Sequence, residues 1–448
     1  MFLNGLLLCI ILLEFKGVTG DLVPIFEFRF TESLYGSESP SEKTETVSSD
    51  TKKALGARQL PFAYPQFQGV SRDSRIEGFK LNRDWDQNPP ELLWRRSIGA
   101  AWSGFVAQDR YAITQEQGES MELVTCYDPF TGELLWSHSD TGRYDSPIGG
   151  LGPGATPLIS GSRVYTMGAT GILNCLEIET GNPVWSRNVI KENEASILDW
   201  GVSHSPLIVG ENIIVTPGGS SGRSVVAYQK DTGELVWSGG ERGSSYSSPF
   251  LPTVHGNQQI VVFNKDGITG HSIHDGTVVW DYPWSGRNPN VAIPLALPGN
   301  KFLASSGYGV GCALLNIHIG EDQKLTVERE WKSLRLKSKF SNVIEKEGYI
   351  YGLDDGIMVC LDLADGKRKW KEGRYGHGQF ILVGDLLLIS TEKSEIVLFE
   401  PVPDEPRELH RIQVLEGKTW NPPCLAGPYL LVRNHKEAAC YRIPIIEE

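Results

Sequence analysis

Short apolar runs separated by polar turns recur along most of the chain, and the turns follow one pattern. The stretch "DPFTGELLW" (128–136) sets two apolar runs around a Gly, and similar stretches end at Trp185, Trp237, Trp280 and Trp370. In all five, Gly stands four positions before Trp and follows Thr or Asp. Gly accepts the positive φ of a tight turn, and Asp or Thr can bond back to the backbone. The pattern therefore predicts five β-hairpins of one kind.

Two further apolar strands precede each hairpin. "ATPLIS" (155–160), "HSPLIV" (204–209), "SSPFLP" (247–252) and "AIPLAL" (292–297) each open such a strand, and a second strand follows each of them. The unit therefore has four strands, A to D, and Trp closes strand D. These Trp residues are 39 to 52 positions apart, which is the repeat length of a propeller blade. No helical pattern intervenes, which excludes βαβ architectures. The closing residues are Trp94, Trp136, Trp185, Trp237, Trp280, Trp331 and Trp370.

The two ends of the chain complete the count of units. A seventh, degenerate unit runs from "GQFILVGDLLLIS" to "RELHRIQVL" and lacks the Trp. The last stretch, "NPPCLAGPYLLVRNHKEAACYRIP", supplies three strands, and "PPELLWRRSIG" around Trp94 supplies the fourth from the other end of the chain. We therefore expect an all-β, eight-bladed propeller over residues 85–448, closed by an N-terminal strand. Each closing Trp is expected to dock between neighbouring blades.

The N-terminal region differs from this repeat. The apolar run Phe2–Leu13 is too short to span a bilayer, and Val18-Thr19-Gly20 offers small residues for cleavage after Gly20. Residues 1–20 are interpreted as a signal peptide, with an uncleaved short anchor or a misassigned start as alternatives. Residues 21–60 are Ser- and Glu-rich, as in a flexible tether, and 61–84 form a pre-propeller segment. This organisation predicts an exported, periplasmic or cell-envelope protein that contacts a membrane only through residues 1–20, if they remain.

The net charge bears on possible partners, and the placement of the cysteines bears on disulfide bonding. The 448 residues carry a formal net charge of −13, which argues against nucleic acid as a partner. Cys126, Cys175, Cys360 and Cys440 occupy one equivalent slot of strand C in four different units. Slots in separate blades lie beyond disulfide reach, so these residues are expected to be small buried core residues.

The repeat resembles a known family. "VTCYDPFTGELLW" and "VVAYQKDTGELVW" are similar to the pyrroloquinoline-quinone (PQQ)-type repeat, and the resemblance covers residues from about 85 to 445. It implies one of three groups: quinoprotein alcohol and sugar dehydrogenases, a non-enzymatic group that includes the outer-membrane assembly lipoprotein, or exported bacterial propellers of unassigned role. The preface "YPQFQGVSRDSRIEG" (64–78) resembles the third group, with Val70 and Ser74 where Pro and Gly are expected.

The resemblance leaves two hypotheses for function. The dehydrogenases usually carry an adjacent-Cys disulfide and an acidic and amide set for Ca²⁺, and neither can be placed here. The first hypothesis is therefore a binding or scaffold propeller for a protein or extracellular polymer, with no catalytic residue. The alternative is a dehydrogenase that uses PQQ with Ca²⁺. The repeat marks a fold and does not by itself specify a cofactor.

Ligands of propellers bind at the mouth of the central channel, where the strands A begin. Polar or aromatic residues at those positions could hold a small planar or anionic ligand, or could bond channel water and neighbouring blades. "KSLRLKSKF" (332–340) alternates in the manner of a half-buried strand whose cations could grip carboxylates or form a solvated edge. No metal site is predicted, because the candidate ligands lack short spacing. The candidates are Trp102, His204, Tyr246, Asn290, Lys337, Lys339, His377, Trp420 and Asn421.

"LDDG" (353–356) has two interpretations. Asp354 and Asp355 could form a Ca²⁺ pair, or Asp355-Gly356 could be the hairpin turn between strands B and C. The hairpin is the simpler of the two.

Overall fold

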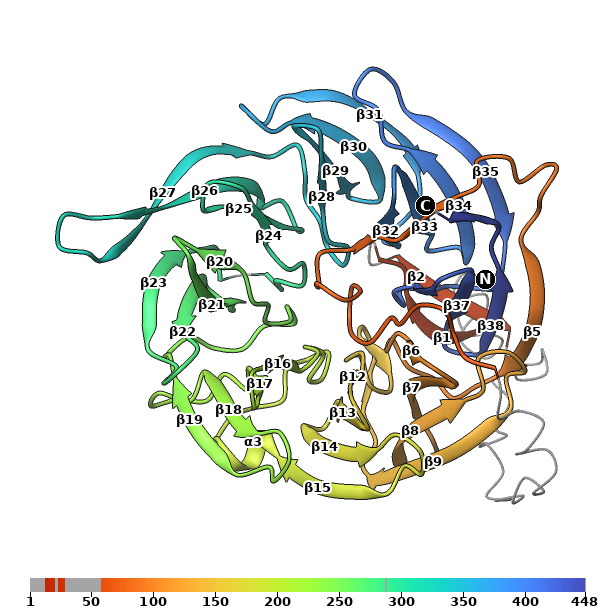
Figure 1. Ribbon diagram of the computed structural model, residues 1–448, viewed down its shortest axis with the longest axis horizontal. Helices are drawn as coiled ribbons and strands as arrows, with labels where there is room; N and C mark the ends of the chain where they lie inside the picture. The colour runs from red at the N-terminus through yellow and green to blue at the C-terminus, as the bar shows by residue number, and fades with distance from the viewer. Residues whose placement is uncertain (1–12, 21–22, 29–57, 287, 448) are drawn as a thin grey trace, which may run out of the picture.

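Eight antiparallel sheets stand around a central channel, as the sequence pattern predicted (Figure 1). The computed structural model describes residues 13–20, 23–28, 58–286 and 288–447. Within these ranges the chain is almost entirely β, with a single short helix, α3 (Val189–Glu192). Successive blades pack side by side around the ring, so each sheet buries both faces against its neighbours.

The first four blades follow the predicted order. Blade 1 holds β6 (Val106–Gln108), β7 (Tyr111–Gln117), β8 (Met121–Tyr127) and β9 (Leu134–Thr141). Blade 2 holds β12 (Leu158–Ser160), β13 (Arg163–Met167), β14 (Ile172–Glu177) and β15 (Pro183–Asn188). Blade 3 holds β16 (Leu207–Val209), β17 (Asn212–Val215), β18 (Val225–Gln229) and β19 (Leu235–Gly239). Blade 4 holds β20 (Thr253–Val254), β21 (Asn257–Phe263), β22 (Gly267–Ser272) and β23 (Val278–Pro283).

The remaining blades include the degenerate seventh and the shared eighth. Blade 5 holds β24 (Leu295–Leu297), β25 (Lys301–Ser306), β26 (Gly311–Ile319) and β27 (Leu325–Ser333). Blade 6 holds β28 (Ile344–Lys346), β29 (Tyr349–Asp354), β30 (Ile357–Asp362) and β31 (Arg368–Arg374). Blade 7 holds β32 (Gln379–Val383), β33 (Leu386–Ser390), β34 (Glu395–Glu400) and β35 (Arg407–Gln413). Blade 8 holds β36 (Cys424–Ala426), β37 (Tyr429–Arg433) and β38 (Glu437–Arg442), with β5 (Glu91–Ser97) as its fourth strand.

The ring is closed by the N-terminal strand. β5 pairs antiparallel with β38, and Trp94 lies opposite Cys440. A second pair, β4 (Phe79–Leu81) with β39 (Ile445–Glu447), joins the segment before the propeller to the end of the chain. The prediction of closure by the strand around Trp94 is therefore confirmed. The two pairings give blade 8 its full four strands and tie both ends of the propeller chain together.

A β-bulge recurs at one position of every blade. In each pairing of strands C and D the register shifts directly after the pair that contains the Trp position, as at Cys126 opposite Trp136. A bulge bends the strand and re-aims the next side chains, so it turns the Trp toward the following blade. The residue opposite the Trp is Cys in four blades, Ala227 or Gly270 in two and Leu314 in blade 5. The six cysteines of the described ranges are free and buried, as expected.

Most of the Trp rings lie on the Gly of the next blade's turn. The Nε1 of Trp94 donates to the carbonyl of Pro129 at 2.9 Å, and the ring covers Gly132, whose φ is +73°. A Cβ at Gly132 would stand 2.6 Å from the ring of Trp94, so the close approach requires Gly. Gly181 on Trp136, Gly233 on Trp185 and Gly366 on Trp331 repeat both the ring contact and the hydrogen bond to the next blade. Gly276 repeats the ring contact with Trp237, whose Nε1 makes no hydrogen bond within the described chain.

Trp280 departs from this arrangement. Its Nε1 donates to Gln259 of its own blade at 2.7 Å, and its ring lies 5.6 Å from that of Phe302. The next blade does not offer the short Gly turn, because β26 and β27 form a long hairpin that extends beyond the ring (Figure 1). The Trp therefore packs within the interface of blades 4 and 5.

The missing Trp of blade 7 is replaced by two residues. His410 lies in its place, opposite Leu398, and the ring of Trp85 stacks on it with centroids 6.0 Å apart. His410 Nε2 also lies 2.9 Å from the carbonyl of Arg83. The segment before the propeller thus fills the position that the degenerate blade leaves.

That segment crosses the centre of the ring (Figure 1, orange). Tyr64 pairs with Ala107 of blade 1, and β3 (Arg75–Ile76) pairs parallel with the end of β32 in blade 7. Between them Arg72 is buried and donates to the carbonyls of Ser205, Pro206 and Pro249. Its burial lowers the pKa of Arg72 to about 9. The segment contacts the C-terminal ends of strands A, so it closes one end of the channel.

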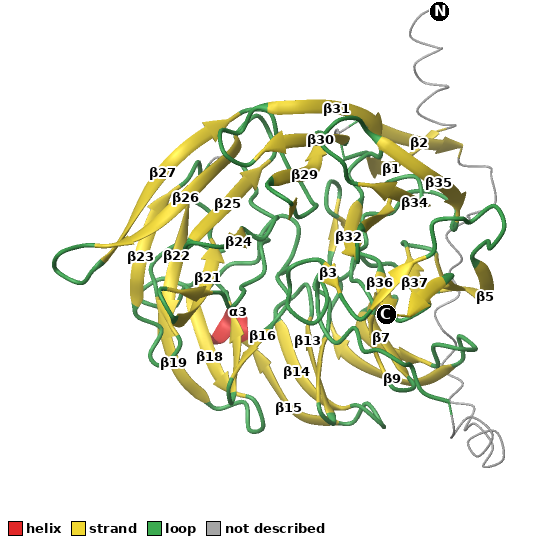
Figure 2. Cartoon of the chain, turned by 45° about the horizontal axis from the view of Figure 1, so that its top comes forward, coloured by secondary structure: helices red, strands yellow, loops and turns green. Residues whose placement is uncertain are grey.

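At the other end a short hairpin covers the channel. β1 (Leu13–Val18) pairs with β2 (Pro24–Phe28), and the hairpin lies over the side of the ring formed by blades 7 and 8 (Figures 1 and 2). These strands fall in the predicted export segment and tether. The rest of those segments, 1–12, 21–22 and 29–57, lies outside the described residues. The assignment of 1–20 and 21–60 therefore stays a prediction.

Two details of the sequence analysis were wrong. "KSLRLKSKF" was expected to form a strand, but the described chain after Ser333 is irregular until Ile344. It is neither a strand nor a solvated edge, because it connects two blades and buries Leu336 and Lys339. Strand A of blade 4 was placed at 247–252 and instead lies at Thr253–Val254, since the preceding residues make only one bridge, from Phe250 to Val261.

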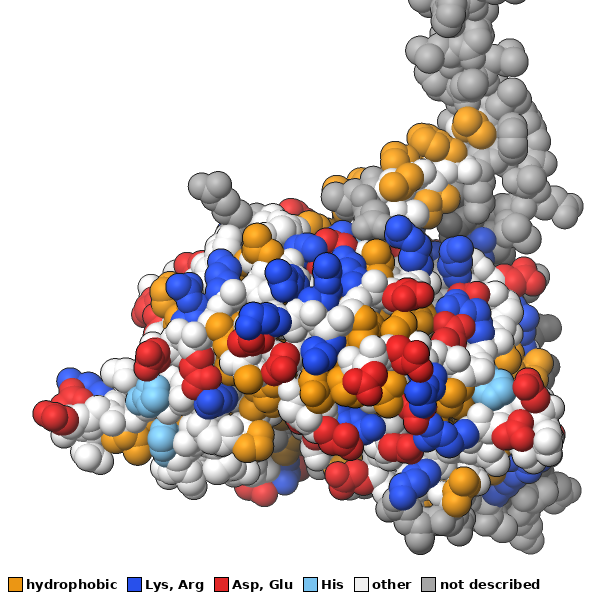
Figure 3. Space-filling view, turned by 90° about the horizontal axis from the view of Figure 1, so that it is seen from above, with side chains coloured by type: hydrophobic (Ala, Val, Ile, Leu, Met, Phe, Trp, Pro, Cys, Tyr) orange, Lys and Arg blue, Asp and Glu red, His pale blue; other side chains and the backbone are white. Residues whose placement is uncertain are grey.

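The outer surface mixes both signs of charge. Lys, Arg, Asp and Glu side chains are interspersed over the face seen in Figure 3, and many form ion pairs, such as Arg242 with Asp281 at 2.7 Å. No helix in the part of the chain that the structure describes is long and apolar enough to cross a membrane.

Candidate functional site at the channel mouth

A cavity of about 130 Å³ lies at the covered end of the channel. Its walls come from the connections that lead into strands A and from one turn between strands B and C. Phe67 of the pre-propeller segment also lines it, and Val18, Thr19 and Gly20 of the hairpin cover it. The aromatic residues around it are Trp102, Trp200, Tyr246, Tyr308, Phe340 and Trp420.

These aromatic rings pack in two groups. Trp420 lies 4.5 Å from Trp102 and 4.9 Å from Phe340, measured between ring centroids. Trp200 stacks on Tyr246 at 4.8 Å and approaches Phe340 edge-on at 6.0 Å. Offset and edge-on packing of this kind stabilises a rigid aromatic wall. The wall is built from connections of five different blades, so only ring closure brings it together.

Lys418 places a cation on this wall. Its Nζ lies 3.9 Å from the ring centroid of Trp420 and 5.1 Å from that of Trp102, which is cation–π geometry. Burial lowers the pKa of Lys418 to about 8, although Glu392 acts in the opposite direction. The same Nζ donates to the backbone carbonyl of Val18 at 2.7 Å.

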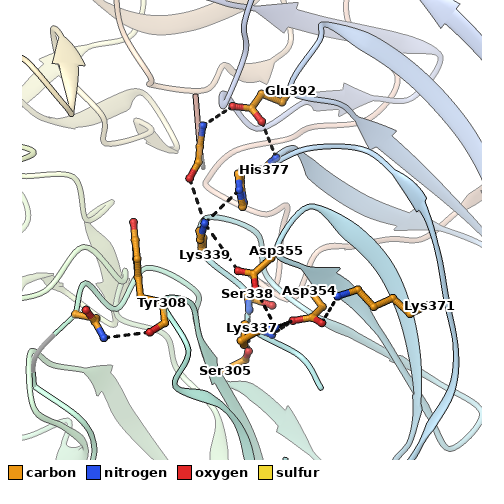
Figure 4. A network of polar contacts seen from close by, with 12 residues as sticks. Ser305, Tyr308, Lys337, Ser338, Lys339, Asp354, Asp355, Lys371, His377 and Glu392 are labelled. Carbon is orange, nitrogen blue, oxygen red and sulfur yellow. Dashed lines mark hydrogen bonds and ion pairs between the residues drawn. The ribbon is translucent and has the colours of Figure 1, made fainter. Parts of the chain in front are cut away.

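A second lysine reaches the hairpin from the other side (Figure 4). Lys339 is buried, and its Nζ lies 3.2 Å from the carbonyl oxygen of Gly20 and 3.4 Å from Nε2 of His377. Asp355 lies 3.8 Å from the same Nζ. The two ammonium groups therefore meet two backbone carbonyls of one chain segment.

Glu392 receives the backbone N–H of that segment. Its Oε1 accepts from Gly20 N at 2.7 Å and from Trp420 Nε1 at 2.8 Å, and its Oε2 accepts from His377 N at 3.1 Å. Two donors of the propeller, Trp420 Nε1 and His377 N, orient the carboxylate and so prepare it for the backbone amide of Gly20. Charge-assisted bonds of this type are stronger than neutral ones.

The seat of Gly20 has no room for a side chain. A Cβ at this position would overlap the imidazole of His377. The site therefore combines contacts to the peptide backbone with exclusion of any residue larger than Gly.

The structure brings five of the nine predicted site residues to this mouth. Trp102, Tyr246 and Trp420 line the cavity, and Lys339 and His377 contact Gly20. Their role in binding remains a prediction.

The other four predicted site residues lie in structural contacts. His204 Nε2 accepts from Thr216 N at 3.1 Å, and burial lowers the pKa of His204 to about 4, which keeps it neutral. Asn421 donates to the carbonyls of Ala101 and Ser103, at 3.0 and 2.8 Å. These contacts tie neighbouring strands together, which is the alternative that the sequence left open.

Asn290 and Lys337, the last two predicted site residues, also make structural contacts. Asn290 donates to the carbonyl of Asn264 at 2.8 Å. Lys337 pairs with Asp354 at 2.6 Å and with Asp355 at 2.8 Å (Figure 4). Asp355, with φ of +48°, and Gly356 form the turn between β29 and β30, so the hairpin interpretation of "LDDG" is confirmed.

Sequence reasoning missed several residues of the mouth. Glu392 and His435 lie in turns between strands B and C, whereas the search covered only the starts of strands A. His435 stacks edge-on against Trp102 at 3.5 Å, and burial lowers its pKa well below the usual value. The aromatic residue of "DWGVSHSP", Trp200, was available as a signal, since it precedes a strand A as Trp420 does.

With Val18–Gly20 in place, the mouth does not fit a quinone held with Ca²⁺. Its two carboxylates are engaged: Glu392 accepts three hydrogen bonds, and Asp355 pairs with Lys337 and Lys339. The described cysteines are buried within strands, so none forms a disulfide platform at the mouth. Ligand pockets commonly measure roughly 300–1,000 Å³, well above the cavity found here.

One group of metal-type side chains occurs elsewhere in the described chain. Asp84, Asp86 and His410 approach one another on the outside of blade 7, and both carboxylates are exposed. An exposed acidic cluster alone does not define a site.

The architecture is that of an eight-bladed β-propeller with PQQ-type repeats. A family model described as outer membrane protein assembly factor BamB matches residues 120–372, more than half of the chain. The chain therefore belongs to this family.

Individual relatives are more distant. The BamB of Aliivibrio fischeri is 46% identical over 59 residues, which are 13% of this chain and 15% of that protein. The aligned region thus covers a small part of the curated relative.

Solved structures share the fold at low identity. BamB from Moraxella catarrhalis aligns with a TM-score of 0.55 and 14% identity, over 79% of this chain and 98% of that one. Quinohemoprotein alcohol dehydrogenase ADHIIG from Pseudomonas putida HK5 aligns with a TM-score of 0.57 and 10% identity, over 89% of this chain and 82% of that one. A europium-containing methanol dehydrogenase aligns with a TM-score of 0.52 and 11% identity, over 88% of this chain and 100% of that one. Likeness at this identity shows the fold alone.

Proposed function

We propose that this protein is an exported, non-enzymatic binding module whose channel mouth engages a protein partner. The observation that carries the proposal is the pairing of Lys339 and Lys418 with two backbone carbonyls beside an aromatic wall. Backbone carbonyls are common to all polypeptides, so such a mouth suits a protein partner better than a small planar molecule. A quinone would leave Glu392 without its amide donor and would add carboxylates beside it.

The family supports the same proposal. The matching family model and the curated relative are named as outer membrane protein assembly factors, a role that rests on contacts with other proteins. We infer that this chain acts at the cell envelope as well, after export directed by residues 1–20. The mixed surface charge seen in Figure 3 favours specific contacts over nonspecific adsorption to polyanions.

An array of immobilised synthetic peptides tests the proposal. The purified chain without residues 1–20, in which every blade is complete and the mouth is open, should bind a subset of peptides saturably. The double variant Trp102→Ala/Trp420→Ala should lose that binding, because it removes the aromatic wall at the mouth. The matched control is Leu235→Ala, whose side chain is 60% exposed on the outside of blade 3 and should leave binding unchanged.

The quinone alternative is tested in the same preparation. Addition of PQQ with Ca²⁺ should give no saturable change of the absorption spectrum and no dye-linked alcohol oxidation. A bound quinone that turns over, or peptide binding that persists in the double variant, would contradict the proposal.

A further inference from the structure

The hairpin that covers the mouth has the features of a bound ligand. It is held by its backbone from three sides: Lys418 bonds the carbonyl of Val18, Lys339 bonds the carbonyl of Gly20, and Glu392 bonds the N–H of Gly20. All three partners come from connections and turns of the propeller, far from the hairpin in the sequence. Val18 ends strand β1 and Thr19 and Gly20 enter the turn, so the propeller grips the end of a strand by its main chain, which is a general mode of peptide binding.

We propose that the channel mouth is a binding site for the end of a polypeptide strand that turns at a glycine, and that Val18–Gly20 is the occupant supplied by this chain. The inference rests on the proposed function and names its ligand class. A segment of a partner with the same features would compete with Val18–Gly20 for the mouth.

Two side-chain requirements follow from the seat. Glycine is required innermost, because the ring of His377 occupies the space of a Cβ at position 20. An apolar residue is required two positions earlier, since Val18 is only 8% exposed and lines the aromatic cavity. The mouth thus selects three consecutive residues: an apolar residue at the position of Val18, any residue compatible with a turn at that of Thr19, and glycine at that of Gly20.

Covalent linkage determines how the site is shared. A tethered segment has a high effective concentration at the mouth, so a free peptide competes poorly with it. If the chain is cut after Gly20, as the sequence predicts, the occupant can dissociate. Export processing would then open the mouth to partners.

The test uses the uncut full chain, expressed without export and checked by mass. Gly20→Val cannot seat its side chain against His377, so it should empty the mouth. A fluorescein-labelled peptide with residues 13–20, LEFKGVTG, blocked as the amide, should bind this variant about tenfold or more tightly than wild type, where the tethered segment competes. Unchanged affinity between the two chains would overturn the proposal.

Three controls make the result specific. Val23→Ala changes an exposed residue of the same hairpin and should behave as wild type. The peptide LEFKGVTV should fail to bind the Gly20→Val chain. Lys418→Met, added to Gly20→Val, should weaken binding of LEFKGVTG about tenfold or more by removing a charge-assisted hydrogen bond.

The outcomes separate this inference from the proposed function. If the mouth binds array peptides but LEFKGVTV binds as well as LEFKGVTG, the glycine rule is wrong while the binding function stands. If the melting temperature of Gly20→Val equals that of wild type and neither array peptides nor LEFKGVTG bind, both are wrong.

Discussion

The indole of Trp185 in blade 2 lies against Gly233 in the turn of blade 3, and its Nε1 donates to the carbonyl of Lys230 at 2.8 Å. This contact therefore connects the outer strand of blade 2 with the hairpin turn of blade 3. Similar contacts between a Trp ring and the Gly turn of the next blade recur around the ring. A substitution in one interface therefore tests how such contacts hold the blades together.

Trp185→Ala should lower the melting temperature by several degrees. Truncation of a fully buried Trp costs about 3–5 kcal/mol, which is an upper bound for the half-buried Trp185; the change also removes the hydrogen bond to Lys230. Thermal denaturation followed by circular dichroism measures the shift, and Leu235→Ala on the exposed side of blade 3 serves as the control. An unchanged melting curve would contradict docking of blades by these Trp residues.

Gly233→Ala should destabilise the protein more than Gly210→Ala. Both glycines have positive φ, +70° and +59°, so the backbone cost of Ala is similar and about 1 kcal/mol. A Cβ at Gly233 would stand 2.7 Å from the ring of Trp185, whereas no atom lies within 4 Å of one at Gly210. Urea denaturation compares the two variants. Equal losses would show that the turn conformation, and not the indole contact, requires Gly.

Deletion of residues 85–98 should be far more damaging than truncation of residues 1–57. The deletion removes β5, so β38 loses its partner strand, blade 8 keeps only three strands and the ring loses its closure. The truncation leaves every blade complete. Circular dichroism and denaturant titration of the two chains give the comparison, and similar stability would contradict closure of the ring by β5.

Lys418 should give the stability a defined pH dependence. Burial lowers its folded-state pKa to about 8 from the usual 10.5, so the folded chain binds fewer protons there than the unfolded chain. The free energy of unfolding of wild type should therefore rise, relative to Lys418→Met, as pH increases from about 8 to 10.5. Chemical denaturation of both chains at several pH values tests this. A difference that stays constant or falls would contradict burial of the charge.

The fold was accessible from the sequence because its repeats are local. A Gly four positions before Trp marks a hairpin whichever blade contains it, and Trp94 without preceding strands indicated the closing strand. Blade 7 was still recognised, although His410 replaces its Trp, because its apolar strands keep the same order.

The site was harder to predict because it is assembled by ring closure. Trp102 and Trp420 are far apart in sequence and meet only where blades 8 and 1 adjoin. Lys339 was named as a candidate but was placed on a half-buried strand, because alternation of polar and apolar residues also occurs in an irregular connection. Nothing in the pattern around Arg72 indicated that the segment before the propeller would enter the channel.

Crystals of the Gly20→Val chain soaked with LEFKGVTG give the most direct test of the channel mouth. We predict density for the peptide beside Trp420, with one backbone carbonyl at Nζ of Lys418 and the glycine against His377. Density for only water at the mouth, or for the chain's own residues 18–20 still seated there, would contradict the account.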